Sequence, residues 1–479
     1  MKLQILFPKQ NFHGINPNVE SVTFDSRQVR PGTLFIAVKG FTVDGHDYIE
    51  MAVERGAVAI VAQQPIETSV PVIYVADTKV AMAEIANRFY GEPMKQLQLV
   101  GITGTDGKTS TATIIEHILN SCAQPSGYIG TNGVRYAGIA EPLHHTTPES
   151  LDLQAIFARM VAQATKVCAM EVSSHALELN RVRGVEFDVA VFTNLSHEHL
   201  DYHKTIENYL AAKAKLFSQL KSSGVAIINA DDALSFAPLK AQIMHPTVTY
   251  GIEHEADFQA TAIEETIKGT KFDVIVEGKT YPVAMKLLGR FNIYNALAAL
   301  ATATAQGIQL EAAITALEQL ASIDGRMEVI DCGQDFGVIV DFAHTPNAIE
   351  NLLTFVRPLT TNRLLLAVGS AGARDTEKRP IIAEIATRLA DYTVLTMDDP
   401  YHEDPSDIID EMITGVVNNN YQKIVARDEA MAHLLAMAQP GDVVIVAGRG
   451  NEDDLPIGNE RIKLNDMTYC REWLETHKK

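Results

Sequence analysis

The chain alternates short apolar runs with longer amphipathic segments over most of its length. From Leu97 onward, the runs Val167–Val172, Val189–Thr193 and Val225–Asn229 are apolar at most positions, and stretches with helical periodicity separate them. Strands that are apolar on both faces are typical of a parallel sheet covered by helices on each side. The alternation therefore predicts an α/β fold.

The pattern changes twice, which predicts three domains. The first part mixes short β-branched runs with glycine and proline, and has helical stretches at Asp47–Arg55 and Lys79–Phe89. After Gly325, a new series of strands from Val338–Val340 to Val443–Ala447 predicts a doubly wound, Rossmann-like domain. We predict a small α/β domain, a central parallel-sheet domain and a C-terminal doubly wound domain at residues 1–97, 98–324 and 325–479.

Charge and cysteine content restrict the class of protein. The 40 lysine and arginine residues against 60 aspartate and glutamate residues leave a net charge of −20, which disfavours nucleic-acid and anionic-membrane partners. The four cysteines form no C-x-x-C pair, and no run of about 18 apolar residues is present. We expect a soluble, cytoplasmic, monomeric protein without membrane insertion.

The segment VGITGTDGKTS (Val100–Ser110) places a glycine-rich turn between a predicted strand and a helix. In this setting backbone N–H groups can bind phosphate, Lys108 can pair with the outer phosphates, and Thr109 can reach a magnesium ion. The spacing differs from G-x-x-x-x-G-K-[ST], because the residue five before Gly107 is Ile102. A turn that serves packing alone is the alternative, but the pattern favours a nucleotide site.

This loop resembles the nucleotide loop of the Mur ligase family, ATP-dependent enzymes that form the amide bonds of the cell-wall precursor peptide. The matching motifs run in order from Asp25 to Glu452 and are most similar to the group that adds the third residue of the peptide. The resemblance implies a ligase that uses ATP and Mg²⁺. It also implies a UDP-sugar-binding first domain, a central P-loop ATPase domain and an amino-acid-binding last domain.

By this resemblance, the catalytic and metal-binding residues lie in the loop and in three further motifs. Glu171 in MEVSSHAL and His199 in TNLSHEHLDYH are implied magnesium ligands, together with Thr109. Lys213 matches a lysine that the family carbamylates, which turns a cation into a metal-holding carboxylate. The implied catalytic set is Lys108, Glu171, His199 and Lys213.

The string His197–His203 also resembles the H-x-H-x-D-H motif of zinc-dependent hydrolases. Tyr202 stands where that motif has its last histidine, and a hydrolase would leave the phosphate loop without a role. The zinc hydrolase is therefore the weaker interpretation.

The resemblance assigns further residues to the two phosphate-bearing substrates. Contacts to ATP are implied for Gly104, Thr105, Asp106, Gly107, Lys108, Thr109, Ser110, Asn292, Arg326, Asp341 and His344. Contacts to the UDP-sugar are implied for Ser26, Phe41, Thr42, Val43, Thr146, Thr147, Ser173 and Arg181.

The segment TMDDPYHEDP (Thr396–Pro405) is expected to select the amino acid, whose carboxylate Arg374 would bind. Family members that add meso-diaminopimelate carry Asp-Asn-Pro-Arg here, and their arginine pairs with the distal carboxylate. This chain has Asp399 and Tyr401 at the second and fourth positions, so a distal carboxylate would lose its cation and meet an extra acid. A distal ammonium is instead expected to meet Asp398, Asp399 and Glu452.

These assignments predict a ligase that joins L-lysine to UDP-N-acetylmuramoyl-L-alanyl-D-glutamate through an acyl phosphate. L-ornithine fits the same charge argument, since one methylene discriminates by only about 1–3 kcal/mol, and meso-diaminopimelate is a further alternative. A ligase with another acceptor, such as folylpolyglutamate synthetase, is disfavoured by the uridine-type first domain. A low-turnover paralogue that binds UDP-sugar and ATP stays open, because Glu198 and Ser370–Ala373 depart from the family pattern.

Overall fold

The computed structural model describes residues 1–8, 10, 16–40, 43–143, 145–196, 198–266, 269–325, 327–373 and 375–477, without the side chains of Leu200 and Asp201. The chain forms two compact units. The first comprises Met1–Ala260, Val274–Tyr281 and Tyr294–Leu317, and the second comprises Thr261–Asp273, Pro282–Ile293 and Glu318–Lys479. The first unit holds both the N-terminal and the central parallel sheet, and the predicted limits between three domains stay a prediction.

The N-terminal sheet is small and parallel, with the strand order β1-β2-β3-β4. β2 (Thr33–Ile36) and β3 (Ala57–Ala62) are buried at nearly every position, between two apolar clusters. α3 (Thr78–Phe89) begins after Asp77, whose carboxylate accepts two backbone N–H groups of the first turn. The other elements are α1 (Leu3–Leu6), β1 (Ser21–Thr23), α2 (Ile49–Glu54) and β4 (Val72–Tyr74).

The second sheet of the first unit has a parallel core in the order β12-β11-β10-β5-β9-β6. β5 (Gln98–Thr103) and β9 (Val167–Glu171) are neighbours at its centre, so the residues that follow them emerge at the same edge. The predicted parallel sheet is therefore confirmed. The other core strands are β6 (Ser126–Gly130), β10 (Phe187–Phe192), β11 (Leu220–Asn229) and β12 (Thr247–Gly251).

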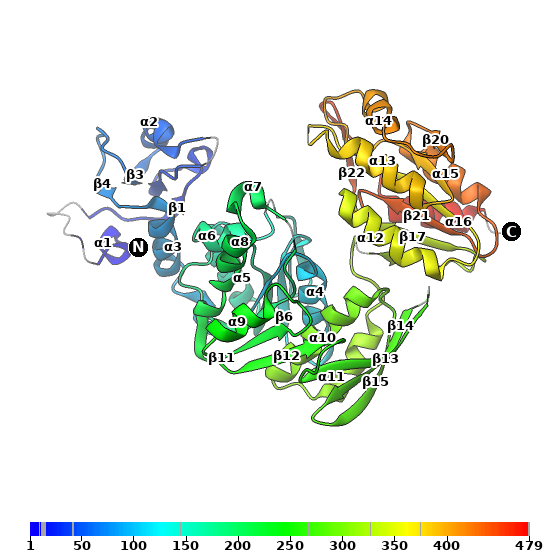
Figure 1. Ribbon diagram of the computed structural model, residues 1–479. Helices are drawn as coiled ribbons and strands as arrows, with labels where there is room; N and C mark the ends of the chain where they lie inside the picture. The colour runs from blue at the N-terminus through cyan, green and yellow to red at the C-terminus, as the bar shows by residue number, and fades with distance from the viewer. Residues whose placement is uncertain are drawn as a thin grey trace. The chain divides into compact units, whose positions relative to one another are not determined.

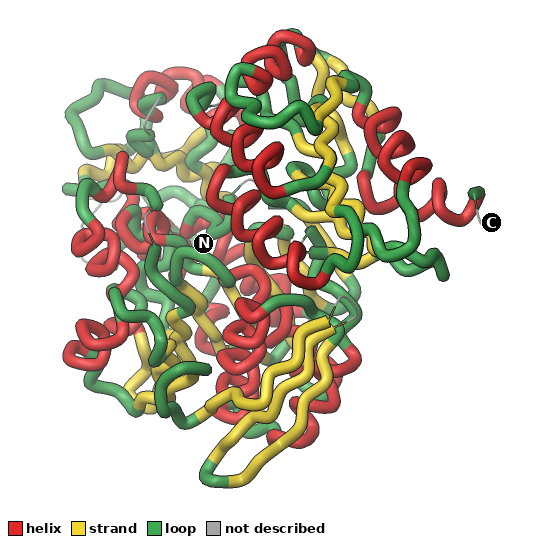
Figure 2. Tube along the Cα trace, turned by 45° about the vertical axis from the view of Figure 1, so that its right-hand side comes forward, coloured by secondary structure: helices red, strands yellow, loops and turns green. Residues whose placement is uncertain are grey.

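This sheet continues on both sides with strands that the sequence pattern did not predict. β7 (Gly133–Tyr136) and β8 (Ile139–Glu141) extend it by antiparallel pairing. On the other side lie β13 (Phe258–Thr266), β14 (Gly269–Val276) and β15 (Lys279–Met285), the long strands in the lower part of Figure 2. Burial alternates along β13 and β14, so these strands lack the continuous apolar runs of the core.

The helices of this central region follow the strands in the predicted alternation (Figure 1). They are α4 (Lys108–Ser121), α5 (Ser150–Ala162), α6 (Ser174–Glu178), α7 (Leu200–His203), α8 (Ile206–Ala214), α9 (Phe236–Gln242), α10 (Arg290–Ala305) and α11 (Leu310–Gln319). α4 begins directly after the phosphate loop and buries its apolar side.

The sheet of the second unit is doubly wound, as predicted, in the order β16-β17-β21-β18-β19-β20. Only β16 pairs antiparallel among these strands. One apolar cluster joins one face to α12, α13 and α14, and another joins the other face to α15 and α16 (Figure 1). The strands are β16 (Glu328–Val329), β17 (Gly337–Asp341), β18 (Leu364–Val368), β19 (Tyr392–Leu395), β20 (Tyr421–Lys423) and β21 (Val443–Ala447), with the hairpin β22 (Asp454–Ile457) and β23 (Glu460–Lys463). The helices are α12 (Pro346–Val356), α13 (Lys378–Leu389), α14 (Pro405–Ile413), α15 (Arg427–Met437) and α16 (Asp466–Thr476).

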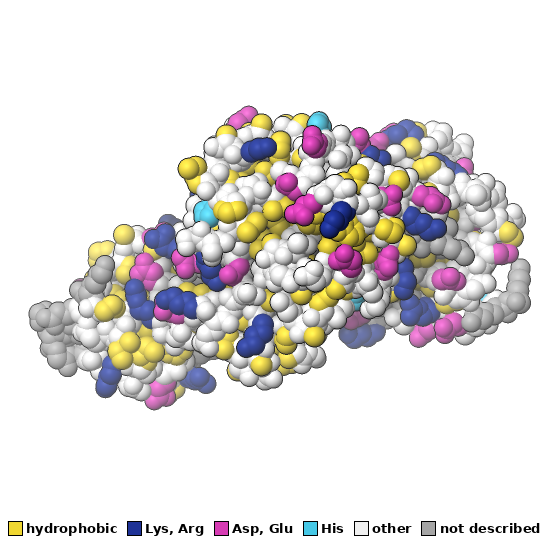
Figure 3. All heavy atoms as spheres, turned by 90° about the horizontal axis from the view of Figure 1, so that it is seen from below, with side chains coloured by type: hydrophobic (Ala, Val, Ile, Leu, Met, Phe, Trp, Pro, Cys, Tyr) yellow, Lys and Arg dark blue, Asp and Glu magenta, His cyan; other side chains and the backbone are white. Residues whose placement is uncertain are grey.

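Charged side chains of both signs are interspersed on the face that Figure 3 shows. No helix in the described part of the chain is long and apolar enough to cross a membrane.

Candidate active site

The glycine-rich segment forms a loop between β5 and α4, as predicted. Gly104 has a φ of 146° and Gly107 a φ of 81°, conformations that residues with side chains rarely adopt. A Cβ on Gly104 would lie 1.9 Å from the Thr193 hydroxyl oxygen. A Cβ on Gly107 would lie 2.4 Å from Asn295 Oδ1. Backbone shape and close neighbours therefore both require glycine at these positions.

The segment after β10 supports the loop. The Asn194 carbonyl accepts the Thr105 N–H at 2.8 Å, and the Asn194 side-chain oxygen accepts the Asp106 N–H at 2.9 Å. The Thr193 hydroxyl donates to the Asp106 carbonyl at 2.6 Å. Sequence reasoning missed Thr193, Asn194 and Asn295. For the first two, their place at the carboxyl end of an apolar strand was the available signal.

Two lysine amines converge on the loop. Lys108 Nζ donates to the carbonyls of Gly104 at 3.1 Å and Thr105 at 2.7 Å. Lys213 Nζ, from α8, donates to the Gly104 carbonyl at 2.5 Å and lies 4.3 Å from the centre of the Tyr209 ring. Burial first, and then the charge of Lys108, lower the pKa of Lys213 well below its usual value. The environment of Lys213 therefore favours the neutral amine.

Glu171, at the end of β9, is fully buried beside the loop. Its Oε2 accepts the Thr109 hydroxyl at 3.0 Å. Its Oε1 accepts the Tyr128 hydroxyl at 2.6 Å and the Thr131 N–H at 2.9 Å. A carboxylate beside a hydroxyl offers the oxygen ligands that Mg²⁺ prefers. The structure thus brings together two predicted metal ligands, Thr109 and Glu171, with two partners, Tyr128 and Thr131, that no sequence motif indicated.

His199 lies just before α7, with a φ of 54° and a half-exposed side chain. Its ring packs edge-on against His175, with 5.0 Å between ring centres, and its Nε2 lies 3.8 Å from Glu198 Oε2. Among the residues that the structure describes, no group of three or more His, Cys, Asp or Glu side chains is arranged to hold a metal ion. His197 and the Asp201 side chain of the zinc-type string lie outside the described residues. A metal-binding role for His199 stays a prediction.

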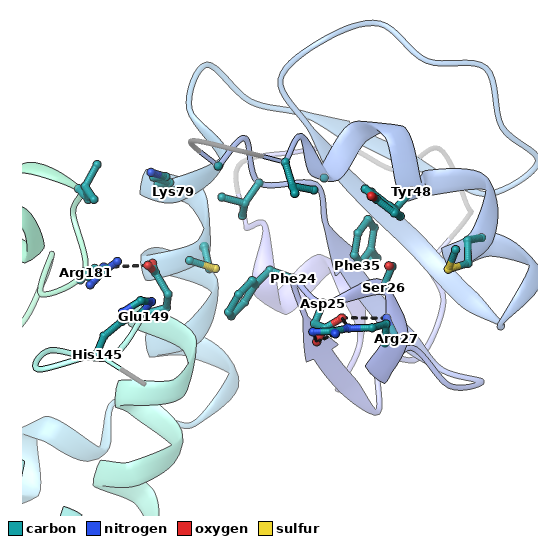
Figure 4. A pocket seen from close by; sticks show the side chains of 17 residues that line it. Phe24, Asp25, Ser26, Arg27, Phe35, Tyr48, Lys79, His145, Glu149 and Arg181 are labelled. Carbon is teal, nitrogen blue, oxygen red and sulfur yellow. Dashed lines mark hydrogen bonds and ion pairs between the residues drawn. The ribbon is translucent and has the colours of Figure 1, made fainter. Parts of the chain in front are cut away.

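A cleft of about 730 Å³ lies between the N-terminal sheet and the segments around His145 and Arg181 (Figure 4). Aromatic rings of Phe24, Phe35 and Tyr48 contribute to its lining, and such rings suit a flat base. Three of the predicted UDP-sugar residues line it, namely Ser26, Val43 and Arg181. The predicted Phe41 and Thr42 lie outside the described residues.

The other predicted UDP-sugar residues lie close to Glu171. The Thr147 hydroxyl donates to the Glu171 main-chain carbonyl at 3.0 Å and accepts the Ser173 N–H at 3.1 Å. The hydroxyl oxygens of Thr146 and Thr131 are 3.2 Å apart. Arg181 donates to the Thr147 carbonyl at 3.1 Å and forms a 2.7 Å ion pair with Glu149, drawn in Figure 4. Hydrogen bonds therefore connect the cleft to the main chain of Glu171.

The remaining predicted ATP residues belong to the second unit. The buried Asn292 side chain donates to the Leu288 carbonyl at 2.8 Å, a local bond at the start of α10. Asp341, at the end of β17, accepts two backbone N–H groups at 2.7 Å each. His344 is exposed, and Arg326 lies outside the described residues. The contacts of these four residues with ATP stay predictions.

Three predicted acids lie at the carboxyl edge of the second-unit sheet, and two of them face a buried arginine. Arg449 is fully buried, 3.0 Å from Asp399 Oδ1 and 3.9 Å from Glu452 Oε2. Within the described residues, the buried Asp398 Oδ2 has no hydrogen-bond partner. Burial and then Asp398 raise the pKa of Asp399, and burial and then Asp399 raise that of Glu452 to about 7. We name Asp398, Asp399 and Glu452 the acidic cluster.

Arg427, on α15, contacts the ends of both strands that lead into the acidic cluster. It forms a fully buried ion pair with Asp466, at 2.6 Å and 2.9 Å. It also donates to the carbonyls of Met397 at 3.1 Å and Ala447 at 2.9 Å, the residues just before Asp398 and Gly448. Neither Arg427 nor Arg449 was a predicted site residue, although Arg449 lies in the motif that contains Glu452.

Two hydrogen bonds join the loop before Arg374 to the segment Thr396–Pro405, which is predicted to select the amino acid. The Gly372 N–H donates to the Asp399 carbonyl at 2.8 Å, and the Ala373 N–H to Glu403 Oε1 at 2.5 Å. Arg374 itself lies outside the described residues. Tyr401 has a φ of 52°, and its N–H donates to the Pro456 carbonyl of β22 at 3.2 Å.

Comparison with known proteins identifies the family. Profiles of the Mur ligase middle domain, the Mur ligase glutamate ligase domain and the Mur ligase family catalytic domain match residues 102–303, 325–450 and 18–90. The UDP-N-acetylmuramoyl-L-alanyl-D-glutamate–2,6-diaminopimelate ligase of Bacillus velezensis is 44% identical over 98% of this chain and 97% of the relative. The enzyme of that name from Geobacillus thermodenitrificans is 44% identical over 98% of this chain and 99% of the relative. A solved structure of a ligase with that name has a TM-score of 0.74 and 29% identity, over 100% of this chain and 99% of the other. Similarity of this extent means that the chain belongs to the Mur ligase family.

Proposed function

We propose that the chain is an ATP-dependent ligase that joins an amino acid to UDP-N-acetylmuramoyl-L-alanyl-D-glutamate. The observation that carries the proposal is the hydrogen bond of 3.0 Å from Thr109, at the end of the phosphate loop, to the buried Glu171 carboxylate. It joins a phosphate-binding turn to an oxygen-rich metal site, the combination that phosphoryl transfer needs. Relatives whose names state this substrate align with 98% of the chain.

In the proposed reaction, the γ-carboxylate of D-glutamate attacks the γ-phosphorus of ATP, and ADP departs as the bond from phosphorus to the carboxylate oxygen forms and gives the acyl phosphate. The amine of the incoming amino acid then attacks the acyl carbon, and phosphate departs from the tetrahedral intermediate as the amide forms. We assign Lys108 to the outer phosphates, and the position of its amine against the carbonyls of Gly104 and Thr105 supports this role. Bound Mg²⁺ would neutralise phosphate charge, and we assign Thr109 and Glu171 to it, with His199 and Lys213 from the sequence resemblance.

The carbamylation proposed for Lys213 needs a neutral amine, because only the free electron pair attacks carbon dioxide. A carbon–nitrogen bond then forms, one proton leaves, and the side chain gains a negative charge. The buried position of Lys213 and its pKa, well below the usual value, support this reaction.

We propose that the cleft beside Arg181 binds the UDP-sugar. Its aromatic lining suits the uracil ring, and Lys79 and Arg181 supply cationic groups for the diphosphate. The Thr147 hydroxyl links this cleft to Glu171 through the main-chain carbonyl, which supports delivery of the substrate carboxylate toward the phosphate loop.

For the amino acid we propose L-lysine, with meso-diaminopimelate as the second candidate. In the acidic cluster, Arg449 faces two carboxyl groups, Asp399 and Glu452, and the buried Asp398 Oδ2 has no hydrogen-bond partner among the described residues, an arrangement that suits a distal ammonium. The names of the relatives favour diaminopimelate, whose distal end carries both an ammonium and a carboxylate. L-ornithine would be the shorter variant of the lysine proposal.

The test is an assay of the purified chain with ATP, Mg²⁺ and the UDP-sugar dipeptide against lysine, ornithine and meso-diaminopimelate, following phosphate release and product mass together. We expect turnover with lysine. Turnover with diaminopimelate alone would overturn the charge argument but keep the ligase. Absence of turnover with all three, alongside intact ATP binding, would favour the low-turnover paralogue.

We also propose a monomeric enzyme in the cytoplasm, where ATP and nucleotide sugars are available. Sedimentation of the purified chain tests the first point, and fractionation of the cells that make it tests the second. A stable dimer in sedimentation would contradict the monomer.

A further inference from the structure

Tyr128, on β6, meets the Glu171 carboxylate from the neighbouring strand. β6 and β9 pair in parallel, with Tyr128 opposite Ala169, which lies two residues before Glu171 on β9. Its hydroxyl donates to Glu171 Oε1 at 2.6 Å, while Glu171 Oε2 accepts the Thr109 hydroxyl at 3.0 Å. Thr131 contacts both oxygens, through its N–H to Oε1 at 2.9 Å and its hydroxyl to Oε2 at 3.3 Å, whereas Tyr128 contacts Oε1 alone and Thr109 contacts Oε2 alone.

Two hydrogen bonds fix the direction of the Tyr128 hydroxyl, one that it donates and one that it accepts. The Asn132 N–H donates to the Tyr128 oxygen at 3.2 Å, so the phenol proton is directed to Glu171. The site is also tightly packed, because a Cβ on Gly130 would lie 2.1 Å from Glu171 Oε1 and 2.3 Å from the Tyr128 hydroxyl oxygen. Little room is left for another rotamer of either side chain.

The ring of Tyr128 is held by a cation. Arg135, directly opposite Tyr128 on β7, places its guanidinium carbon 4.2 Å from the ring centre. Arg135 in turn donates to Glu116 Oε2 at 2.6 Å and 3.1 Å, so its plane is fixed and its charge is balanced. The chain of contacts from Glu116 to Glu171 is continuous.

We propose that Tyr128 is a positioning residue that holds Glu171 Oε1 in the sheet, so that Oε2 stays directed to Thr109 and to the metal ion. This inference rests on the proposed function, in which Glu171 is a magnesium ligand. Tyr128 contacts neither metal nor substrate in this role. Partners that orient a ligating carboxylate affect metal affinity by about 10–100-fold.

The test compares Tyr128→Phe with the unaltered full chain, using Mn²⁺ binding in the presence of ADP, measured by electron paramagnetic resonance. We expect Mn²⁺ affinity to fall by about tenfold, with ADP affinity in the absence of metal unchanged. The matched control is Tyr136→Phe, which removes a hydroxyl from another buried tyrosine of the same sheet. Equal Mn²⁺ affinity in Tyr128→Phe and the unaltered chain would overturn the proposal.

Two further variants separate the possible failures. Glu171→Gln tests the underlying assignment, because unchanged Mn²⁺ binding there would refute Glu171 as a ligand and with it the metal site of the proposed function. Loss of Mn²⁺ affinity in Glu171→Gln without such a loss in Tyr128→Phe would refute the positioning role alone.

If Tyr128→Phe does not fold, Arg135→Lys keeps the charge opposite Glu116 but removes the planar group over the ring. We then expect Mn²⁺ affinity about threefold weaker, and an unchanged value would overturn the proposal.

Discussion

The phosphate loop and the acidic cluster both follow the carboxyl ends of parallel strands, but different groups stabilise them. Backbone N–H and carbonyl groups hold the loop, as in the 2.8 Å bond between Thr105 and Asn194. Buried charges hold the acidic cluster, where Arg449 lies 3.0 Å from Asp399. The loop requires glycines that lie within one short motif, although its supporting partners follow β10, whereas the cluster depends on arginines that no motif indicated as site residues. The first kind of site is visible in a short motif, and the second requires the fold.

The strongest way to break the acidic cluster is to remove Arg427. We expect Arg427→Met to lower the free energy of unfolding by about 3–5 kcal/mol, because Asp466 would stay buried without its cation. Urea denaturation measures this loss. The double variant Arg427→Met/Asp466→Leu should recover most of it, and a double variant no more stable than the single one would contradict the explanation.

The corresponding change in the phosphate loop is Lys108→Ala. Here we expect a fall in the rate of ADP formation of about 10²–10³-fold with little change in stability, because the cation facing the phosphates is lost. A coupled ADP assay measures the rate. Lys95→Ala is the control, since Lys95 forms an exposed pair with Glu92. Near-normal turnover of Lys108→Ala would mean that the proposed mechanism is wrong.

Gly372→Ala tests whether binding of the amino acid requires close packing of the loop at Gly372 against the segment Thr396–Pro405. A Cβ at this position would lie 2.1 Å from the Pro400 carbonyl oxygen, so the loops would have to separate. We expect KM for the amino acid to rise about tenfold, with KM for ATP unchanged as an internal control. An equal rise in both constants would indicate a general loss of structure instead.

The smallest effect concerns pH. Glu452 has a raised pKa of about 7, so it is protonated below that pH and ionised above it. Ionised Glu452 attracts the distal ammonium of both substrates but repels the distal carboxylate that only meso-diaminopimelate carries. The preference for lysine over meso-diaminopimelate, as a ratio of kcat/KM values, should therefore rise about tenfold from pH 6 to pH 8. The ratio cancels titration of the attacking amine, which both substrates share. Glu452→Gln should flatten the profile, and a ratio that falls with pH would exclude this role.

The sequence was a good guide to the regions where burial is continuous. The parallel core strands follow their apolar patterns closely, because a strand buried on both faces has few polar positions. The half-exposed strands β13 and β14 were missed, since one-sided burial produces weaker patterns. The antiparallel strands β7 and β8 were missed because four and three residues are too few to show a pattern. The predicted residues Thr109 and Glu171 do meet, as their positions after neighbouring strands β5 and β9 suggest.

By itself, the sequence determined the α/β class, the phosphate loop and membership of the Mur ligase family. These depend on periodicity and on short motifs, each of which is contained in one continuous stretch of the sequence. Only the tertiary structure decided how Tyr128 contacts Glu171 and how Arg427 and Arg449 stabilise the acidic cluster. The partners in these contacts are between 39 and 50 residues apart, and packing between elements brings them together. Buried charges and carboxylates acquire their orientation and their pKa from such neighbours, which no local pattern records.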